Sequence, residues 1–370
     1  MSELTLKQRF IASLERKDVD KVPVCSVTQT GVVELMEITG AKWPDAHYDP
    51  QKMATLAIAA HELTGLEAVR YPFCNTVMVQ TLGCTITEGS FDSQPQIIDF
   101  PCKKKEDVEA ISSMSGMSGH MDESVCPELA RSAQGCLTIP QDLLESRRIK
   151  TVLEATDIIK NRVGDDVPVI AGILGPAGIA CCLCGVKNYL RWCITKPDVL
   201  EELIALGTRV CTEYANALFD HGADAVVIID SEAGPDLFPP PLFKSMIMPH
   251  YRSITKEMKG HSILHMCGDA TDILDNMADS GFEGLSIEEK VDISYASQVV
   301  DGRACLIGNV SPAFTLLGKT PEHIKKEAKQ CIEDGVGILA PGCGIAPHTP
   351  IENIRAFVAA RDEYYREKKG

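Results

Sequence analysis

Ser262–Gly268 (Ser-Ile-Leu-His-Met-Cys-Gly) has the pattern of a short apolar strand that ends in glycine, and Pro341–Gly344 (Pro-Gly-Cys-Gly) follows a second apolar run far downstream. Alternate side chains of a strand share one face, so we expect His265 and Cys267 to point the same way. Together with Cys343 they offer one imidazole and two thiolates, a ligand set typical of tetrahedral zinc. Three protein ligands leave a fourth position open, as in catalytic zinc sites.

The His-x-Cys pair is weak on its own. The chain has 15 cysteines and nine histidines, so such pairs arise by chance. Cysteine is also commonly buried as a small hydrophobic residue. The glycines that border both segments, and their positions at the ends of predicted strands, favour the zinc site over this simpler interpretation.

Around this stretch the chain alternates between short apolar runs and helical patterns. Apolar runs without polar alternation are typical of parallel strands covered on both faces. Eight such β/α units favour a closed (β/α)₈ TIM barrel, an α/β fold, over a doubly wound open sheet, which is the alternative. We expect one barrel domain over residues 1–370, with an N-terminal helical extension. The predicted strands cover residues 22–27, 66–73, 167–174, 225–230, 263–267, 284–288, 304–308 and 336–340.

Residues from about 103 to 137 depart from this alternation. Glycine, serine and methionine are scattered through them without helical or strand periodicity. We interpret the segment as an insertion between strands two and three, either a cap over the barrel or an ordinary disordered insertion.

The candidate residues gather at one end of the predicted barrel. His265 and Cys267 end the fifth strand, and Cys343 lies just beyond the eighth. Asp230 ends the fourth strand and Glu288 ends the sixth. Because active sites of such barrels lie at the C-terminal ends of the strands, this convergence supports a catalytic site.

Composition limits the classes of partner and compartment. The 370 residues carry a formal net charge of −16, which argues against nucleic acid or an anionic membrane as the main partner. No apolar run of about 18 residues is present, and the first residues lack the apolar region of a signal peptide. Fifteen cysteines without an export signal indicate a reducing compartment. We therefore expect a cytoplasmic protein.

Several motifs resemble the uroporphyrinogen-decarboxylase superfamily, and more closely its methylcobamide:coenzyme M methyltransferases, in the branch that serves methanol metabolism. The resemblance covers nearly the whole chain, and only 103–137 is longer than the family pattern. The decarboxylases lack the zinc triad, which favours the methyltransferase branch. Besides the His-x-Cys pair, the matching segments are Gly308–Val310, Ala340–Pro347, Val22–Gly31 and Gly281–Glu289.

The resemblance implies transfer of a methyl group from a methylated corrinoid protein to coenzyme M, 2-mercaptoethanesulfonate. Zn²⁺ would be the resident metal and a methylcobamide the methyl donor. The chain has no Asp-x-His-x-x-Gly corrinoid-anchoring motif, so the cobamide is expected on a partner or free. The oligomeric state stays open.

Further residues are candidates for supporting roles. The resemblance suggests a glutamate as fourth zinc ligand in the absence of substrate, which is Glu288, with Glu289 as its rival. Asp230 is a candidate to orient the His265 ring or a ligand. The sulfonate is assigned to the loops after strands seven and eight, where many barrels bind phosphate. The residues expected there are Asn309, Gly342 and Gly344.

Three other functions are kept as alternatives. One is a decarboxylase-like lyase that acts on a tetrapyrrole without zinc. Another is the same zinc-thiol chemistry on homocysteine, as in cobalamin-independent methionine synthase. The third is a non-catalytic barrel that carries or senses corrinoid.

Overall fold

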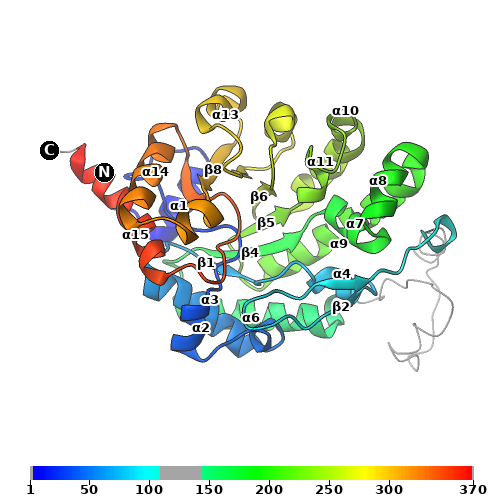
Figure 1. The fold of residues 1–370 in the computed structure, drawn as a ribbon, viewed down its shortest axis with the longest axis horizontal. Coiled ribbons are helices and arrows are strands. Elements are labelled where there is room, and N and C mark those ends of the chain that lie inside the picture. The colour runs from blue at the N-terminus through cyan, green and yellow to red at the C-terminus, as the bar shows by residue number, and fades with distance from the viewer. Residues whose placement is uncertain (1–2, 109–142, 369–370) are drawn as a thin grey trace.

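The computed structural model describes residues 3–108 and 143–368, and Figure 1 shows their arrangement. The strands are β1 (Val69–Tyr71), β2 (Thr85–Ile86), β3 (Ile97–Asp99), β4 (Val169–Leu174), β5 (Ala225–Ile229), β6 (His261–Met266), β7 (Gly284–Ile287), β8 (Cys305–Val310) and β9 (Ile338–Pro341). The helices are α1 (Leu6–Leu14), α2 (Val33–Thr39), α3 (Pro50–Thr64), α4 (Val77–Thr81), α6 (Arg147–Val163), α7 (Pro176–Cys184), α8 (Val186–Thr195), α9 (Pro197–Asp220), α10 (Pro240–Leu242), α11 (Met248–Glu257), α12 (Leu274–Ala278), α13 (Ile293–Val300), α14 (Pro321–Glu333) and α15 (Ile351–Glu367).

The strands form a parallel sheet in the order β1-β4-β5-β6-β7-β8-β9. A short segment closes this sheet into a ring. Val24 forms a parallel bridge with Leu339 of β9, and its carbonyl accepts the amide of Glu67, just before β1, at 2.8 Å. The sequence prediction of a (β/α)₈ barrel is confirmed, and the open-sheet alternative is excluded because the two edges meet.

Two predicted strands are shorter than expected. Only one bridge forms within the predicted strand 22–27, and the predicted strand 66–73 is reduced to β1. Proline contributes to both differences, since it has no amide hydrogen to give to a strand ladder. Pro23 precedes the bridge and Pro72 directly follows β1.

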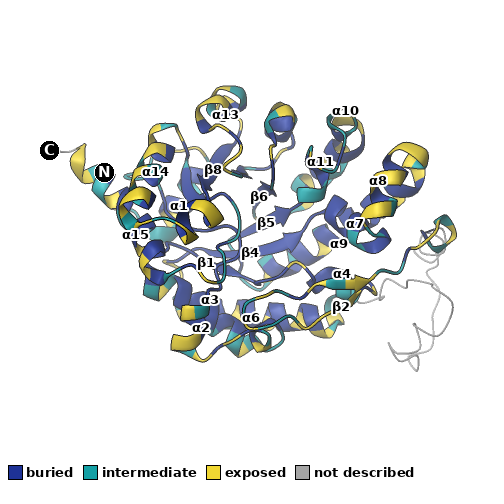
Figure 2. Ribbon diagram, in the orientation of Figure 1, coloured by how far each residue is buried: buried dark blue, intermediate teal, exposed yellow. Residues whose placement is uncertain are grey.

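Helix α1 seals one end of the barrel. Its Phe10 and Leu14 belong to the apolar core inside the ring, together with Val227 and Ile263, and Leu14 approaches Gly284 at the start of β7. A second apolar core lies between the strands and the surrounding helices. Figure 2 shows this arrangement as buried strands and as helices that are exposed on their outer sides.

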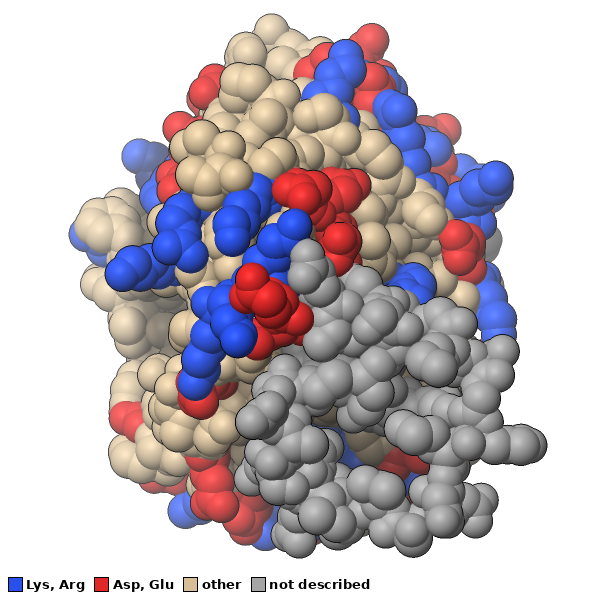
Figure 3. Space-filling view, turned by 90° about the vertical axis from the view of Figure 1, so that its right-hand side faces the viewer, with Lys and Arg blue, Asp and Glu red and all other residues tan. Residues whose placement is uncertain are grey.

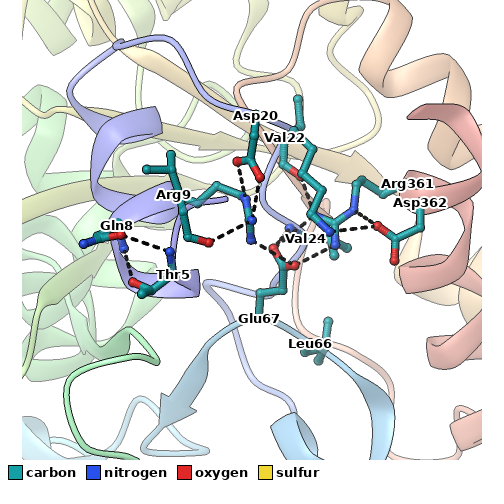
Figure 4. A network of polar contacts seen from close by, with 12 residues as sticks. Thr5, Gln8, Arg9, Asp20, Val22, Val24, Leu66, Glu67, Arg361 and Asp362 are labelled. Carbon is teal, nitrogen blue, oxygen red and sulfur yellow. Dashed lines mark hydrogen bonds and ion pairs between the residues drawn. The ribbon is translucent and has the colours of Figure 1, made fainter. Parts of the chain in front are cut away.

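A buried ionic network ties the closing segment to both ends of the chain (Figure 4). Glu67 accepts two hydrogen bonds from Arg361 of α15, at 2.6 and 3.0 Å, and one from the Val24 amide at 3.2 Å. Arg9 of α1 lies 3.5 Å from the same carboxylate. The network therefore holds α1, the closing segment and α15 together where the ring closes.

The predicted insertion falls mainly outside the described residues. Residues 103–108 are described, whereas 109–137 are not, so the role and the domain status of the segment stay predictions. Before it, β2 and β3 form a small antiparallel sheet apart from the barrel. Within residues 3–108 and 143–368, no helix has the combined length and apolar character that crossing a membrane requires.

Candidate metal centre

Three predicted ligands meet at the C-terminal end of the barrel strands. Nε2 of His265 lies 3.2 Å from Sγ of Cys267, which lies 3.4 Å from Sγ of Cys343. One ligand atom from each residue lies within 4.8 Å of the others, and among the described residues this is the only such group of three or more His, Cys, Asp or Glu side chains. His265 is buried, and the two cysteines are partly exposed.

The His265 ring is oriented by a residue that the sequence analysis did not single out. Nδ1 of His265 lies 2.9 Å from Oγ of Ser286, its register partner on β7. With a metal ion on Nε2, Nδ1 would carry the proton and donate a hydrogen bond to this hydroxyl. A ring held in this tautomer presents a lone pair on Nε2, which is what a metal ligand requires. The sequence did contain a signal for this residue, because Ser286 lies two positions before Glu288 and so shares its face of the strand.

The thiols of Cys267 and Cys343 shift each other's pKa in opposite directions. Their hydrogen bond, together with burial, raises the pKa of Cys267. The same hydrogen bond lowers the pKa of Cys343, and a hydrogen bond with the Gly344 backbone lowers it further. The pair thus favours one thiolate in Cys343, and a bound cation would favour the second because metal ligation displaces thiol protons.

Glu288 and Glu289 both lie beside the centre, in different contacts. Oε2 of Glu288 accepts the amide of Gly268, next to Cys267, at 2.8 Å, and Lys290 lies 3.6 Å from the same oxygen. Glu289 instead accepts a hydrogen bond from Ser311 at 2.7 Å. Of the two, the Glu288 carboxylate is anchored to the segment that carries a predicted ligand.

Asp230 lies directly after β5 as predicted, but its carboxylate binds other groups than the His265 ring. It accepts the amides of Ala177 and Gly178 in the first turn of α7, at 3.3 and 2.7 Å, and the hydroxyl of Tyr251 at 2.8 Å. Burial raises the pKa of Asp230 to about 7. Asp230 therefore caps α7, and Ser286 takes the orienting role proposed for it.

The predicted sulfonate donors already have partners. The side-chain amide of Asn309 donates to the carbonyls of Glu288 and Val291 at 3.0 and 2.8 Å. The Gly342 amide donates to the Val310 carbonyl at 2.8 Å. The Gly344 amide makes a hydrogen bond with Cys343, which adds to the effect of Cys267 in lowering the pKa of Cys343. These groups shape the loops around the centre, and their contact with a substrate anion stays a prediction.

A second polar cluster follows β1 and was not predicted. Sγ of Cys74 accepts hydrogen bonds from Arg148 at 3.3 Å and from Thr76 at 3.4 Å. Burial alone would raise the pKa of Cys74, but contacts with His47 and Arg148 lower it to about 6. Cys74 and the buried Arg148 therefore form a polar pair below the barrel surface.

Fold and site together define a (β/α)₈-barrel protein with a thiol-rich, metal-capable centre at the C-terminal ends of its strands. The chain belongs to the uroporphyrinogen decarboxylase family, whose family model matches residues 5–364.

Its relatives include proteins with named activities. A methylcobamide:CoM methyltransferase MtaA from Methanosarcina barkeri is 46% identical and covers 99% of this chain and 100% of its own length. A methylcobamide:CoM methyltransferase MtbA from Methanosarcina acetivorans is 33% identical over 98% of this chain and 99% of its own. A solved structure of a methyltransferase from Methanosarcina mazei is 45% identical, with a TM-score of 0.88 over 98% of this chain and 100% of that one.

Proposed function

We propose that this protein is a zinc-dependent methyltransferase that moves a methyl group from a methylated corrinoid to the thiol of coenzyme M. The observation that carries the proposal is the convergence of His265, Cys267 and Cys343 within 4.8 Å at the strand ends. The full-length relatives named as methylcobamide:CoM methyltransferases support the same conclusion.

The donor set fits zinc better than the other common metals. Two thiolates and one imidazole are soft and borderline ligands, which favour zinc over magnesium or calcium. Bound zinc supplies a Lewis acid that keeps a thiol deprotonated at neutral pH. Two thiolates and a neutral imidazole balance the charge of Zn²⁺, and we infer that this electron-rich set suits sulfur activation better than three histidines would.

The chain's own residues prepare the centre for a thiol. Ser286 fixes the His265 ring, and the Gly344 backbone favours the thiolate of Cys343. We assign Glu288 as the fourth ligand in the absence of substrate, because the Gly268 amide holds its carboxylate beside Cys267. Exchange of this carboxylate for a substrate thiolate would leave the net charge unchanged.

The transfer itself is a heterolytic displacement. The substrate thiolate forms a sulfur–carbon bond to the methyl group, and the methyl–cobalt bond breaks with both electrons remaining on cobalt. The products are methyl-coenzyme M and the cob(I)amide form of the corrinoid, and the thiol proton leaves to solvent.

The corrinoid partner would approach the face on which the strands end. Figure 3 shows one side of the molecule, the right-hand side of Figure 1, on which basic and acidic side chains lie next to one another. We place the reaction in the cytoplasm, with a methylated corrinoid protein as the donor.

The test measures zinc content and methyl transfer from methylcobalamin to coenzyme M, followed by loss of the methyl–cobalt absorbance. We expect about one zinc per chain in the wild type, and loss of both zinc and turnover in Cys343→Ala. Cys182→Ala, on α7, removes a partly buried thiol outside the centre and is the matched control.

Each alternative has its own outcome. Turnover with homocysteine and none with coenzyme M would change the substrate and keep the mechanism. Stoichiometric zinc without turnover on either thiol would favour a carrier or sensor, and a zinc-free protein that acts on a tetrapyrrole would favour the lyase.

A further inference from the structure

Arg70 is a buried cation on the inner wall of the barrel. It is 2% exposed, and strand alternation places it on the same face as Ala68, a member of the core inside the ring. Its Nε donates to the Val27 carbonyl at 3.2 Å, and its Nη1 donates to the Pro72 carbonyl. Both carbonyls belong to chain that leaves the C-terminal ends of the strands, so the guanidinium is held near the mouth.

The adjacent strand β4 is adapted to this side chain. A Cβ atom at position 172 on β4 would overlap Nη2 of Arg70, so only glycine leaves room for the guanidinium in its present place. Burial lowers the pKa of Arg70 to about 10, and the neighbouring thiols of Cys74 and Cys343 oppose that shift. Cys343 of the metal-capable centre is thus one of the groups that act on Arg70.

Among the described residues, Arg70 has no carboxylate partner. The buried Arg9 and Arg361 both pair with Glu67 and with a second carboxylate each, Asp20 and Asp362 respectively. Burying a guanidinium is costly, and the hydrogen-bond partners of Arg70 are two carbonyls, with the thiols of Cys74 and Cys343 as its nearby acidic groups. Arginine has five N–H donors, and the described residues accept only two of those on Arg70.

The position of Arg70 relative to the centre suits a short substrate with an anion at one end. In the closed ring, only the segment around Val24 separates β1 from β9. Cys343 follows shortly after β9 in the chain. That segment fixes both sides, because Val27 holds Arg70 while the Gln29 carbonyl accepts the amide of Ile345, two residues after Cys343, at 3.0 Å.

We propose that Arg70 is the anion-binding residue of the substrate site and holds the sulfonate of the thiol substrate while the thiol faces His265, Cys267 and Cys343. The inference rests on the proposed function. Guanidinium donors in a planar fork match the oxygens of a tetrahedral anion. A buried arginine without a neighbouring carboxylate also disfavours the ammonium group of an amino-acid thiol, which would select coenzyme M over homocysteine.

The test compares coenzyme M with 2-mercaptoethanol, which keeps the thiol and lacks the sulfonate, in zinc-loaded enzyme with free methylcobalamin. In Arg70→Gln we expect the KM for coenzyme M to rise about ten- to hundredfold, the range for hydrogen bonds to a charged group. The kcat/KM for 2-mercaptoethanol should stay within about twofold, because that thiol makes no contact with the guanidinium.

Two further variants separate charge from geometry. Arg70→Lys keeps the charge without the fork and should give an intermediate KM. Gly172→Ala displaces the guanidinium and should change the KM in the same direction as Arg70→Gln. Arg191→Gln removes an exposed arginine on α8 and is the control for a general loss of positive charge.

Binding of ethanesulfonate, measured by calorimetry, needs no turnover and separates the two proposals. Binding to the wild type that is lost in Arg70→Gln supports the anion site even if methyl transfer is absent. Turnover in the wild type with the same KM for coenzyme M in Arg70→Gln, Arg70→Lys and Gly172→Ala would overturn the anion site and leave the methyltransferase standing. Should Arg70→Gln fail to fold, the other two variants and the ethanesulfonate measurement decide the question.

Discussion

Replacement of Glu67 by glutamine probes how the barrel closes. The variant keeps the size of the side chain and removes its charge, which faces two guanidinium groups with side chains 2% exposed. In the wild type, Arg361 binds both oxygens of Glu67, at 2.6 and 3.0 Å, and Arg9 lies at 3.5 Å. A glutamine offers one acceptor oxygen and turns an amide group toward cations.

The expected loss of unfolding free energy depends on the carboxylates that still pair with Arg9 and Arg361 in the variant. Removing one partner of a buried ion pair typically costs about 3–5 kcal/mol, because the other charge is left buried. Here Asp20 still accepts two hydrogen bonds from Arg9, both at 2.8 Å, and Asp362 accepts one from Arg361 at 2.7 Å. Both cations keep a counter-charge, so we expect a loss near the lower limit, about 3 kcal/mol.

Urea unfolding at pH 7 measures this loss, and Asp362→Asn is the matched control on the same arginine. Asp362 is 49% exposed, so its removal should cost no more than about 1 kcal/mol. The pKa of Asp20 is lowered in the folded protein by the hydrogen bond between Asp20 and Arg9. The stabilisation by Asp20 is therefore complete above the pKa that Asp20 has in the unfolded chain, and it is constant at pH 7.

Amide exchange at Val24 is the local measurement, because that amide donates to Glu67. We expect faster exchange at Val24 in Glu67→Gln than in Asp362→Asn. A loss below about 1 kcal/mol with unchanged exchange at Val24 would refute the claim that the buried pair holds the ring closed.

Two further predictions concern the metal centre. Ser286→Ala should weaken zinc binding about ten- to hundredfold in a chelator competition, as loss of a residue that orients a metal ligand typically does. Ser262→Ala, on the neighbouring strand, is the control. Equal zinc affinities of the wild type and Ser286→Ala would assign Ser286 to packing alone. Glu288→Gln should weaken zinc binding in the absence of thiol and change the pH profile of thiol binding, because a neutral amide is a poorer ligand than a carboxylate. If neither quantity changes, Glu288 is not a ligand.

The sequence was sufficient to locate the strands and the three metal-capable residues, since both depend on local patterns. Apolar runs identify buried parallel strands, and the two-residue period of a strand puts His265 and Cys267 on one face. Cys343 could be added because parallel strands of a barrel end at the same mouth. None of these inferences needs a side-chain conformation.

The residues that the sequence analysis missed or misassigned depend on conformations that no local pattern fixes. Asp230 ends its strand as predicted, but the free amides at the start of α7 attract its carboxylate away from His265. Ser286 contacts His265 only through the register between β6 and β7. Arg70 looks like any charged residue in the sequence, and its burial follows from the closed ring and from Gly172.

The inward side chains change from apolar to polar along the strands, and this change links the fold to the chemistry. The switch runs from Ala68, just before β1, to Arg70, and on three further strands from Ile263 to His265, from Gly284 to Ser286 and from Ile307 to Asn309. A one-residue slip in register would turn these polar groups outward, so the apolar layer sealed by α1 maintains the site.

Thiol activation and anion binding are assigned to different residues at the C-terminal ends of the strands. A zinc centre with two thiolates and a neutral imidazole would carry no net charge, or one negative charge with Glu288 bound, so it would not attract an anionic substrate. Arg70, held by carbonyls on the neighbouring wall, has the positive charge that the centre lacks. Substitutions at Arg70 should therefore act on substrate binding and those at Cys343 on thiol activation, so the two variants should differ in which of KM and kcat they change.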